Sequence, residues 1–123
     1  MPLSSEWELA TKGAEGRPFP WGTDLPTHDG VAFDLRDGGA PHPRDVGSSP
    51  QDVSPEGVHD LGGNVAEWVD DDRGDIDTKV IRGGSWASRG PCHLLGSGCQ
   101  RVGAGKYNRD VGFRCASSVM NRG

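Results

Sequence analysis

Two short stretches in the second half of the chain constrain the fold most, because each joins a strand-like apolar run to residues that favour a turn. The first, Val80–Trp86, reads VIRGGSW, and its glycine pair permits a bend directly after a strand. The second, Val111–Cys115, reads VGFRC and alternates apolar residues with glycine and arginine. We predict two strands whose core anchors are Trp86 and Phe113. They frame an irregular polar segment over residues 86–111, which is the candidate functional segment.

The rest of the chain is sparse in apolar residues, which favours a single loop-rich domain over residues 1–123. Only 33% of the 123 residues are hydrophobic, whereas 20 are glycine and 9 are proline, so turns should outnumber long helices. A capping box formed by Ser5 and Glu8 predicts a short helix that ends at Gly13. Residues 24–57 are expected to form a long loop, with VAFDL and RDVG as candidate edge strands. The run GNVAEWVDD predicts a further strand.

Charge and cysteine content narrow the classes of partner and compartment. The formal net charge is −5 with both signs interspersed, which argues against nucleic acid or an anionic membrane as the partner. No apolar run is long enough for a signal peptide or a membrane span. Three cysteines are an odd number and do not make a disulfide framework, so a reducing compartment such as the cytoplasm is favoured. One disulfide with one remaining thiol is the open alternative.

Two groups of residues have the chemistry of a metal site when spacing alone is considered. Asp60 and Glu67 flank a glycine turn that can bring carboxylate and carbonyl oxygens together, which suits Ca²⁺. A solvated acidic turn explains the same spacing and is favoured on spacing alone. Cys92 and Cys99, with His93 nearby, have side chains that bind soft metals. Because the chain has no C-x-x-C pair, incidental thiols are favoured over a metal site.

Five motifs in one order resemble the formylglycine-generating enzyme family, also called the sulfatase-modifying factor family. They are PLSSEWE (2–8), FPWG (19–22), HDLGGNVAEWVDD (59–72), VIRGGSW (80–86) and VGFRC (111–115). The resemblance spans nearly the whole chain and corresponds to the C-terminal part of the usual family domain. It implies a C-type-lectin-like fold of the α+β class, loop-rich and with little regular secondary structure.

The resemblance also implies a set of calcium ligands. In this family the segment that contains GNVAEW here ligates calcium, which assigns the carboxylates of Asp60 and Glu67 and the backbone carbonyls of Gly63 and Val65 as ligands. A structural calcium site is therefore favoured over a solvated acidic turn once the family is considered.

The resemblance does not carry over the copper chemistry of the family's oxidases. Those enzymes hold copper with two cysteines that follow the GGS motif, and the corresponding positions here are Ser88 and His93. Copper is therefore not expected. If the chain is an enzyme, a rearranged site made of Cys92, Cys99 and Ser85 would carry the oxidation.

A ligand-binding domain is the favoured function. The same fold serves as a non-catalytic domain, including the variable proteins of diversity-generating retroelements, in which the segment between RGGSW and GFR is diversified and lines a ligand-binding surface. By its placement, the segment in this chain is predicted to bind a protein or a small molecule through an exposed patch. The patch residues are Trp86, Ser88, Arg89, Pro91, His93, Leu94, Gln100, Tyr107 and Arg109.

Three other readings stay open. The alternative function is a divergent or truncated formylglycine-generating oxidase, which would convert a sulfatase cysteine to formylglycine. An ordinary lectin-like loop without diversification explains the same placement. A decayed fragment of the family domain is the third.

Overall fold

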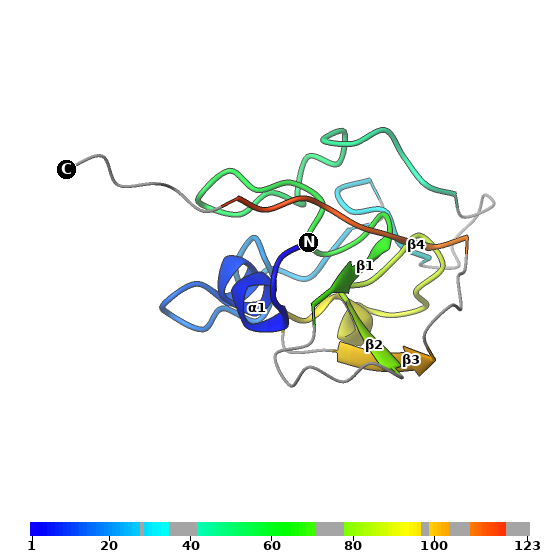
Figure 1. Ribbon diagram of the computed structural model, residues 1–123. Coiled ribbons are helices and arrows are strands. Elements are labelled where there is room, and N and C mark those ends of the chain that lie inside the picture. The colour runs from blue at the N-terminus through cyan, green and yellow to red at the C-terminus, as the bar shows by residue number, and fades with distance from the viewer. Residues whose placement is uncertain (28, 35–41, 71–77, 97–98, 104–108, 118–123) are drawn as a thin grey trace.

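A small mixed sheet beside a short helix organises the chain, and most of the remaining residues run in turns and irregular segments (Figure 1). The computed structural model describes residues 1–117 apart from 28, 35–41, 71–77, 97–98 and 104–108. Its elements are α1 (Ser4–Lys12), β1 (Ala66–Val69), β2 (Thr78–Arg82), the 3₁₀ helix η1 (Pro91–Leu94), β3 (Cys99–Gly103) and β4 (Val111–Gly112). No helix in the described ranges is long and apolar enough to cross a membrane.

The sheet brings the three patterned stretches of the sequence side by side. Its strand order is β3-β2-β1-β4, with β1 antiparallel to β2 and parallel to β4. In this register Glu67 lies opposite Arg82 on one side and Gly112 on the other. The segment that continues from β4 crosses the molecule towards the α1 side (Figure 1). The motif residues, distant in sequence, therefore meet at the centre of the sheet.

Four sequence-based predictions about strands need correction. The strand predicted over VGFRC is only Val111–Gly112, and the segment predicted to be irregular contains a full strand, β3. This strand forms because it pairs with β2 along five positions, from Thr78↔Gly103 to Arg82↔Cys99. Among the described residues of VAFDL and RDVG no strand forms, so both edge-strand predictions are wrong.

Helix α1 forms where the sequence predicts it, but with a different first turn. The Leu3 backbone N–H donates to Glu6 Oε1 at 2.8 Å, so the predicted Ser5–Glu8 capping box is wrong. The helix ends at Gly13, as predicted, where φ is +65° and glycine alone is free of strain. The buried face of α1 carries Trp7 into the core.

Arg82 joins α1 to the sheet, which explains the arginine of the RGGSW motif. Arg82 is 8% exposed. Its Nε donates to Ser4 Oγ at 2.8 Å, Nη1 donates to the Gly96 carbonyl at 3.3 Å and Nη2 donates to Glu8 Oε2 at 3.3 Å. The guanidinium also lies 5.9 Å from the Trp7 ring centroid, within reach of a cation–π attraction. Each of the three guanidinium nitrogens of this buried arginine thus donates a hydrogen bond.

Two clusters of buried side chains make up the core. One contains Trp7, Leu61, Val69 and Val80. The other contains Phe19, Val31, Phe33 and Leu94.

The core anchors predicted for the two framing motifs are not both buried. Phe113 is 67% exposed, so its prediction as a core anchor is wrong, since β4 ends before it and leaves the side chain on the surface. Trp86 is half-buried.

Candidate functional site

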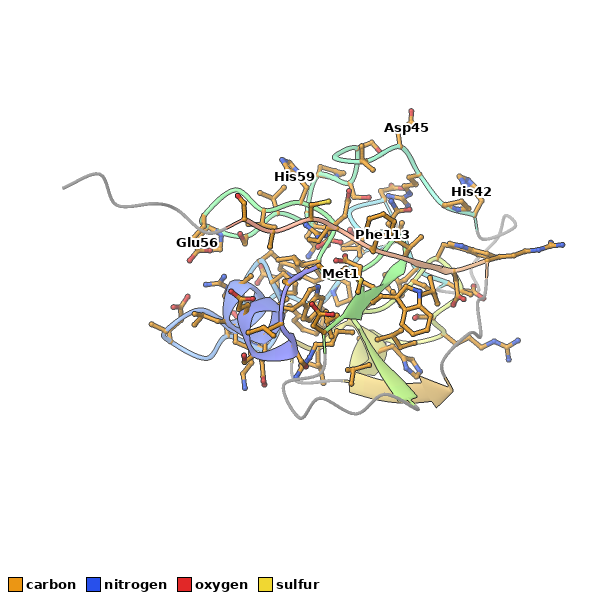
Figure 2. All side chains as sticks on the ribbon, viewed as in Figure 1. Met1, His42, Asp45, Glu56, His59 and Phe113 are labelled. Atoms are coloured by element: carbon orange, nitrogen blue, oxygen red, sulfur yellow. The ribbon has the colours of Figure 1, made fainter. Side chains whose placement is uncertain are left out.

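An acidic pocket of about 220 Å³ opens between the glycine turn before β1 and the segment after β4. Figure 2 shows two residues of its rim, His59 and Phe113, on the same side of the molecule. Two exposed apolar side chains, Val46 and Phe113, stand at this rim, 88% and 67% exposed. The residues that line the pocket are Val46, His59, Asp60, Val65, Glu67, Phe113 and Arg114.

Both carboxylate oxygens of Glu67 accept hydrogen bonds inside this pocket. Glu67 is 3% exposed, and its Oε1 accepts hydrogen bonds from Trp7 Nε1 at 3.1 Å and from Arg114 Nε at 2.5 Å. Arg114 Nη2 donates to Oε2 at 2.7 Å and to the His59 carbonyl at 2.9 Å. This two-point contact is the strong geometry for an arginine and a carboxylate. Glu67 therefore links helix α1 to the segment after β4.

The carboxylate of Asp60 is only half satisfied. Asp60 is 9% exposed and sits at a φ of +62°. Its Oδ2 accepts a hydrogen bond from the Gly47 N–H at 2.8 Å, but its buried Oδ1 has no hydrogen-bond partner among the described residues. A buried carboxylate oxygen without a partner is costly, so this atom marks where a cationic or hydrogen-bonding group would be stabilised.

A third carboxylate, Asp52, supports the turn from below. Asp52 is fully buried and accepts hydrogen bonds from the N–H groups of Gly62 and Gly63, at 2.9 and 2.8 Å. Burial raises the pKa of Asp52 to about 6, and the charge of Asp60 adds to this, while the two N–H groups and Arg114 oppose it. Asp52 thus fixes the backbone that carries Asp60.

Sequence analysis missed Asp52 as part of the site and assigned no role to Arg114. Arg114 carried a signal, because it belongs to the VGFRC motif that frames the sheet. Burial by itself would lower the pKa of Arg114, but the hydrogen bonds and charge of Glu67, with the charges of Asp60 and Asp52, raise it. Asp52 lies in the long loop among other polar residues and carries no pattern that distinguishes it.

The predicted calcium ligands are brought together, but not in a ligating arrangement. Asp60, Val65 and Glu67 all line the pocket, and Gly63 lies in the turn beside it. Oxygen donors of this kind suit Ca²⁺, and Asp60 Oδ1 is free to act as one. Glu67, in contrast, is neutralised by Arg114. In the part of the chain that the structure describes, no group of three His, Cys, Asp or Glu side chains is arranged to hold a metal.

The predicted ligand-binding patch is mostly on the surface. Arg89, Pro91, His93 and Arg109 are exposed, and Ser88 and Trp86 are half-buried. The indole N–H of Trp86 is buried without a hydrogen-bond partner. We call the set Trp86, Ser88, Arg89, Pro91, His93 and Arg109 the loop surface.

Three members of the predicted patch fall outside the loop surface. Leu94 is 1% exposed and packs in the core with Phe19, Val31 and Phe33, so its prediction as a ligand-binding residue is wrong. It was misassigned because η1 turns this one side chain inwards. The side chain of Gln100 and the whole of Tyr107 lie outside the described residues.

The backbone of the loop surface is held by the serines that follow the glycine pair. Ser85, 2% exposed, donates its hydroxyl to Asp110 Oδ2 at 2.8 Å and accepts a hydrogen bond from the Ala87 N–H at 3.2 Å. The Ser85 N–H donates to Ser88 Oγ at 2.9 Å, and the Trp86 N–H donates to the Asn64 carbonyl at 2.7 Å. Ser85 therefore anchors the loop, and its catalytic role in an oxidase stays a prediction.

The glycine pair allows this loop to approach the core. A Cβ on Gly84 would lie 2.2 Å from Leu94 Cδ2 and 2.8 Å from the Gly62 carbonyl oxygen. Its N–H donates to that same carbonyl at 2.9 Å. Only glycine fits at this contact.

The three cysteines lie in different segments of the structure. Cys92 is an exposed free thiol on η1, and Cys115 is an exposed free thiol after β4. Cys99 begins β3, and its side chain lies outside the described residues.

Comparison with known proteins agrees with the motif order. The sulfatase-modifying factor enzyme 1-like domain model matches residues 1–119. "Inactive C-alpha-formylglycine-generating enzyme 2" of Bos taurus is 30% identical over an alignment 135 residues long, which covers 97% of this chain and 44% of that protein. The Mus musculus protein of the same name is also 30% identical, over 43% of its length. The chain thus spans less than half the length of these relatives.

Solved structures share the fold at lower sequence identity. CarF gives a TM-score of 0.73 at 21% identity, over 92% of this chain and 45% of its own. PvdO from Pseudomonas aeruginosa also gives a TM-score of 0.73, at 22% identity, over 92% of this chain and 50% of its own. Treponema denticola variable protein 1 gives a TM-score of 0.72 at 23% identity, over 92% of this chain and 45% of its own. With its single described α-helix, small mixed sheet and mostly irregular chain, this protein belongs to the family of sulfatase-modifying factor enzyme 1-like domains.

Proposed function

We propose that this chain is a ligand-binding domain of the formylglycine-generating enzyme family without oxidase chemistry. The observation that carries the proposal is the use made of Ser88. It stands where the resemblance implies the first copper cysteine, and its hydroxyl accepts the Ser85 N–H at 2.9 Å. The chain has a hydroxyl in place of a copper-binding thiolate at this position, and this hydroxyl holds the loop conformation. The name of the two related "inactive" proteins supports the same direction.

The side chains of the loop surface suggest the chemistry of the ligand. Arg89 and Arg109 are exposed cations, His93 is also exposed, and the indole N–H of Trp86 has no partner among the residues that the structure describes. These groups donate hydrogen bonds and positive charge. We expect a protein or small-molecule ligand that presents carboxylate, phosphate or other acceptor groups.

A binding screen with matched variants tests this function. Arrays of acidic peptides and of charged glycans would be probed with the wild-type chain, with Arg89→Glu/Arg109→Glu and with Lys12→Glu. Lys12 lies on α1 and makes an ion pair with Glu8, so the last variant changes charge away from the loop surface. The expected result is binding that the double variant loses and the Lys12 variant keeps. Equal loss in both variants, or no binding to any probe, would contradict the proposal.

The alternative oxidase function has one favouring observation, the exposed thiol of Cys92 on η1. It is tested by incubating the chain with Cu(I), oxygen and a peptide that carries a sulfatase-type cysteine, and by following the peptide mass. We expect no conversion. Formation of formylglycine that Cys92→Ser abolishes would replace the binding function with the oxidase.

We further propose that the loop surface is a diversified one, as in the variable proteins with which the fold is shared. The support is placement between two motifs. In RGGSW the side chains of Arg82 and Ser85 are buried and hydrogen-bonded, and in VGFRC the guanidinium of Arg114 pairs with Glu67. Sequencing of the genomic neighbourhood tests this: a reverse-transcriptase gene with a near-copy of the region that encodes residues 86–113 is expected. A locus with neither would remove the diversification proposal and leave the binding proposal standing.

We also propose that the acidic pocket binds calcium. The favouring observation is Asp60 Oδ1, buried in the pocket and without a partner. Calcium would be held by Asp60 and Glu67 with carbonyl oxygens of the glycine turn, and it would neutralise their charge. We expect millimolar calcium to raise the melting temperature and a chelator to lower it. Asp60→Asn should remove the difference, and a melt that ignores calcium would contradict the site.

A further inference from the structure

The acidic pocket already contains a cation of its own, the guanidinium of Arg114. Arg114 donates to both carboxylate oxygens of Glu67, at 2.5 and 2.7 Å, and to the His59 carbonyl at 2.9 Å. The Glu67 carboxyl is 4% exposed and the Arg114 side chain 29% exposed. Glu67 therefore cannot turn towards solvent, and the only group that can leave the pair without disrupting the sheet is Arg114.

Three hydrogen bonds occupy most of the acceptor positions of Glu67 while this pair is intact. Its Oε1 accepts two hydrogen bonds, from Trp7 and Arg114, and its Oε2 accepts one from Arg114. A divalent cation bound by Glu67 would lie next to the guanidinium, and two like charges at contact distance repel. The guanidinium and the metal therefore compete for this carboxylate.

Asp60 shows that the single guanidinium does not satisfy the whole pocket. Its Oδ1 is buried in the same pocket with no partner, while Oδ2 accepts only the Gly47 N–H. Asp52 adds a third carboxylate directly behind the turn. The pocket thus keeps an attraction for a second cation even when Arg114 is in place.

From these contacts we propose that Arg114 and a divalent cation compete for Glu67, so that Arg114 sets the calcium affinity of the pocket. This inference rests on the calcium proposal above. In the wild-type chain calcium binds weakly, because it must displace the guanidinium of Arg114 from Glu67. When Arg114 is removed, Glu67 becomes a free anionic ligand and calcium takes the place of the guanidinium.

Arg114 is placed so that release is local. It follows β4, whose last residue is Gly112, and its neighbours Phe113 and Cys115 are exposed. Movement of this segment breaks the ion pair but leaves the β1–β2 register intact, because Arg114 takes no part in it. The exchange of one cation for the other therefore needs no unfolding of the sheet.

The test measures calcium binding by titration calorimetry on the chelator-treated chain at constant ionic strength. The variants are Arg114→Gln, Glu67→Gln/Arg114→Gln and, as a charge-matched control, Lys12→Gln, which removes a cation on α1 outside the pocket. Arg114→Gln is expected to bind calcium at least about tenfold more tightly than the wild type. The double variant should lose this gain, and Lys12→Gln should match the wild type.

Each other outcome has a defined meaning. Equal calcium affinity in the wild type and Arg114→Gln, abolished in both by Asp60→Asn, would overturn the competition and leave the calcium site in place. No binding by either chain in millimolar calcium would overturn the calcium site and the competition together.

Arg114→Gln leaves the buried Glu67 charge without its partner, which destabilises the fold. A folding defect in this variant does not block the test. If this variant is unfolded in chelator, tryptophan fluorescence is followed as calcium is added. Folding driven by calcium supports the competition, and a chain that stays unfolded at millimolar calcium overturns it.

Discussion

Asp52 makes the stability of this protein respond to acid in an unusual direction. Most aspartates that accept hydrogen bonds are easier to ionise in the folded state, but burial raises the pKa of Asp52 to about 6, from an ordinary value of 3.8. The folded chain therefore holds the proton more tightly than the unfolded chain does. The stability that comes from this proton is fully present below about pH 3.8 and is lost as the pH rises through about 6.

The size of the effect follows from the two pKa values. Their difference corresponds to about 3 kcal/mol between the extremes, at about 1.4 kcal/mol per pH unit. Between about pH 7.5 and about pH 5 only part of it is gained, about 1.4 kcal/mol. Asp52 thus opposes the loss of stability that other carboxylates cause when they are protonated.

A double difference isolates the contribution of Asp52. Urea unfolding, followed by tryptophan fluorescence in chelator, would give the free energy of unfolding at the two pH values for the wild type and for Asp52→Asn, which cannot titrate. The wild type should gain about 1.4 kcal/mol relative to the variant on acidification. Asp45→Asn, at an exposed aspartate, should respond to pH as the wild type does.

One result refutes the reasoning. If the wild type and Asp52→Asn change in parallel between the two pH values, the carboxyl of Asp52 is ionised throughout and burial does not control it. Asp52→Asn also loses one of two charge-assisted bonds to backbone N–H groups. If Asp52→Asn does not fold, a carboxyl-carbon NMR titration of the wild type gives the pKa of Asp52 directly. A pKa near 3.8 would likewise refute the control of Asp52 by burial.

Three further substitutions test the framework of the loop surface by urea unfolding. Gly84→Ala puts a Cβ 2.2 Å from Leu94 Cδ2 and should cost about 1–3 kcal/mol; a neutral result would mean that the loop shifts freely. Leu94→Ala should cost about 2–5 kcal/mol because the side chain is 1% exposed, whereas Phe113→Ala should stay within about 0.5 kcal/mol, and equal costs would contradict the assigned burial. Ser85→Ala removes the hydrogen bond to Asp110 and should cost about 1–2 kcal/mol and expose the loop to limited proteolysis; an unchanged cleavage pattern would argue against Ser85 as its anchor.

Apolar runs were sufficient to locate two of the strands. Strands β1 and β2 lie where these runs predict them, because Val69 and Val80 are buried in one cluster with Trp7. Helix α1 was located by its end at Gly13, although the capping box predicted for its start is wrong. Strand β3 was missed because its stability comes from pairing with β2, and its own residues show no alternation. Pairing with a distant strand leaves no local signal.

The polar part of the site was less predictable for a related reason. The sequence identified Asp60 and Glu67 through a known motif. In the structure Glu67 forms an ion pair with Arg114, and Asp52 accepts hydrogen bonds from the N–H groups of the glycine turn. These partners are set by hydrogen bonds between segments far apart in the chain, and such bonds require no periodic spacing. Leu94 illustrates the opposite error, since one apolar residue in a polar segment is turned inwards by η1.

The contact of Trp7 with Glu67 has a consequence for how the chain is made. During synthesis α1 leaves the ribosome 60 residues before Glu67, and the guanidinium that completes the trio follows a further 47 residues later. A helix of 9 residues is too short to persist alone in water. Its apolar face must therefore wait, exposed, while most of the chain is translated. We expect translation pauses before Glu67 has left the ribosome to increase capture of nascent chains by chaperones, and pauses after Arg114 has left it to have no such effect.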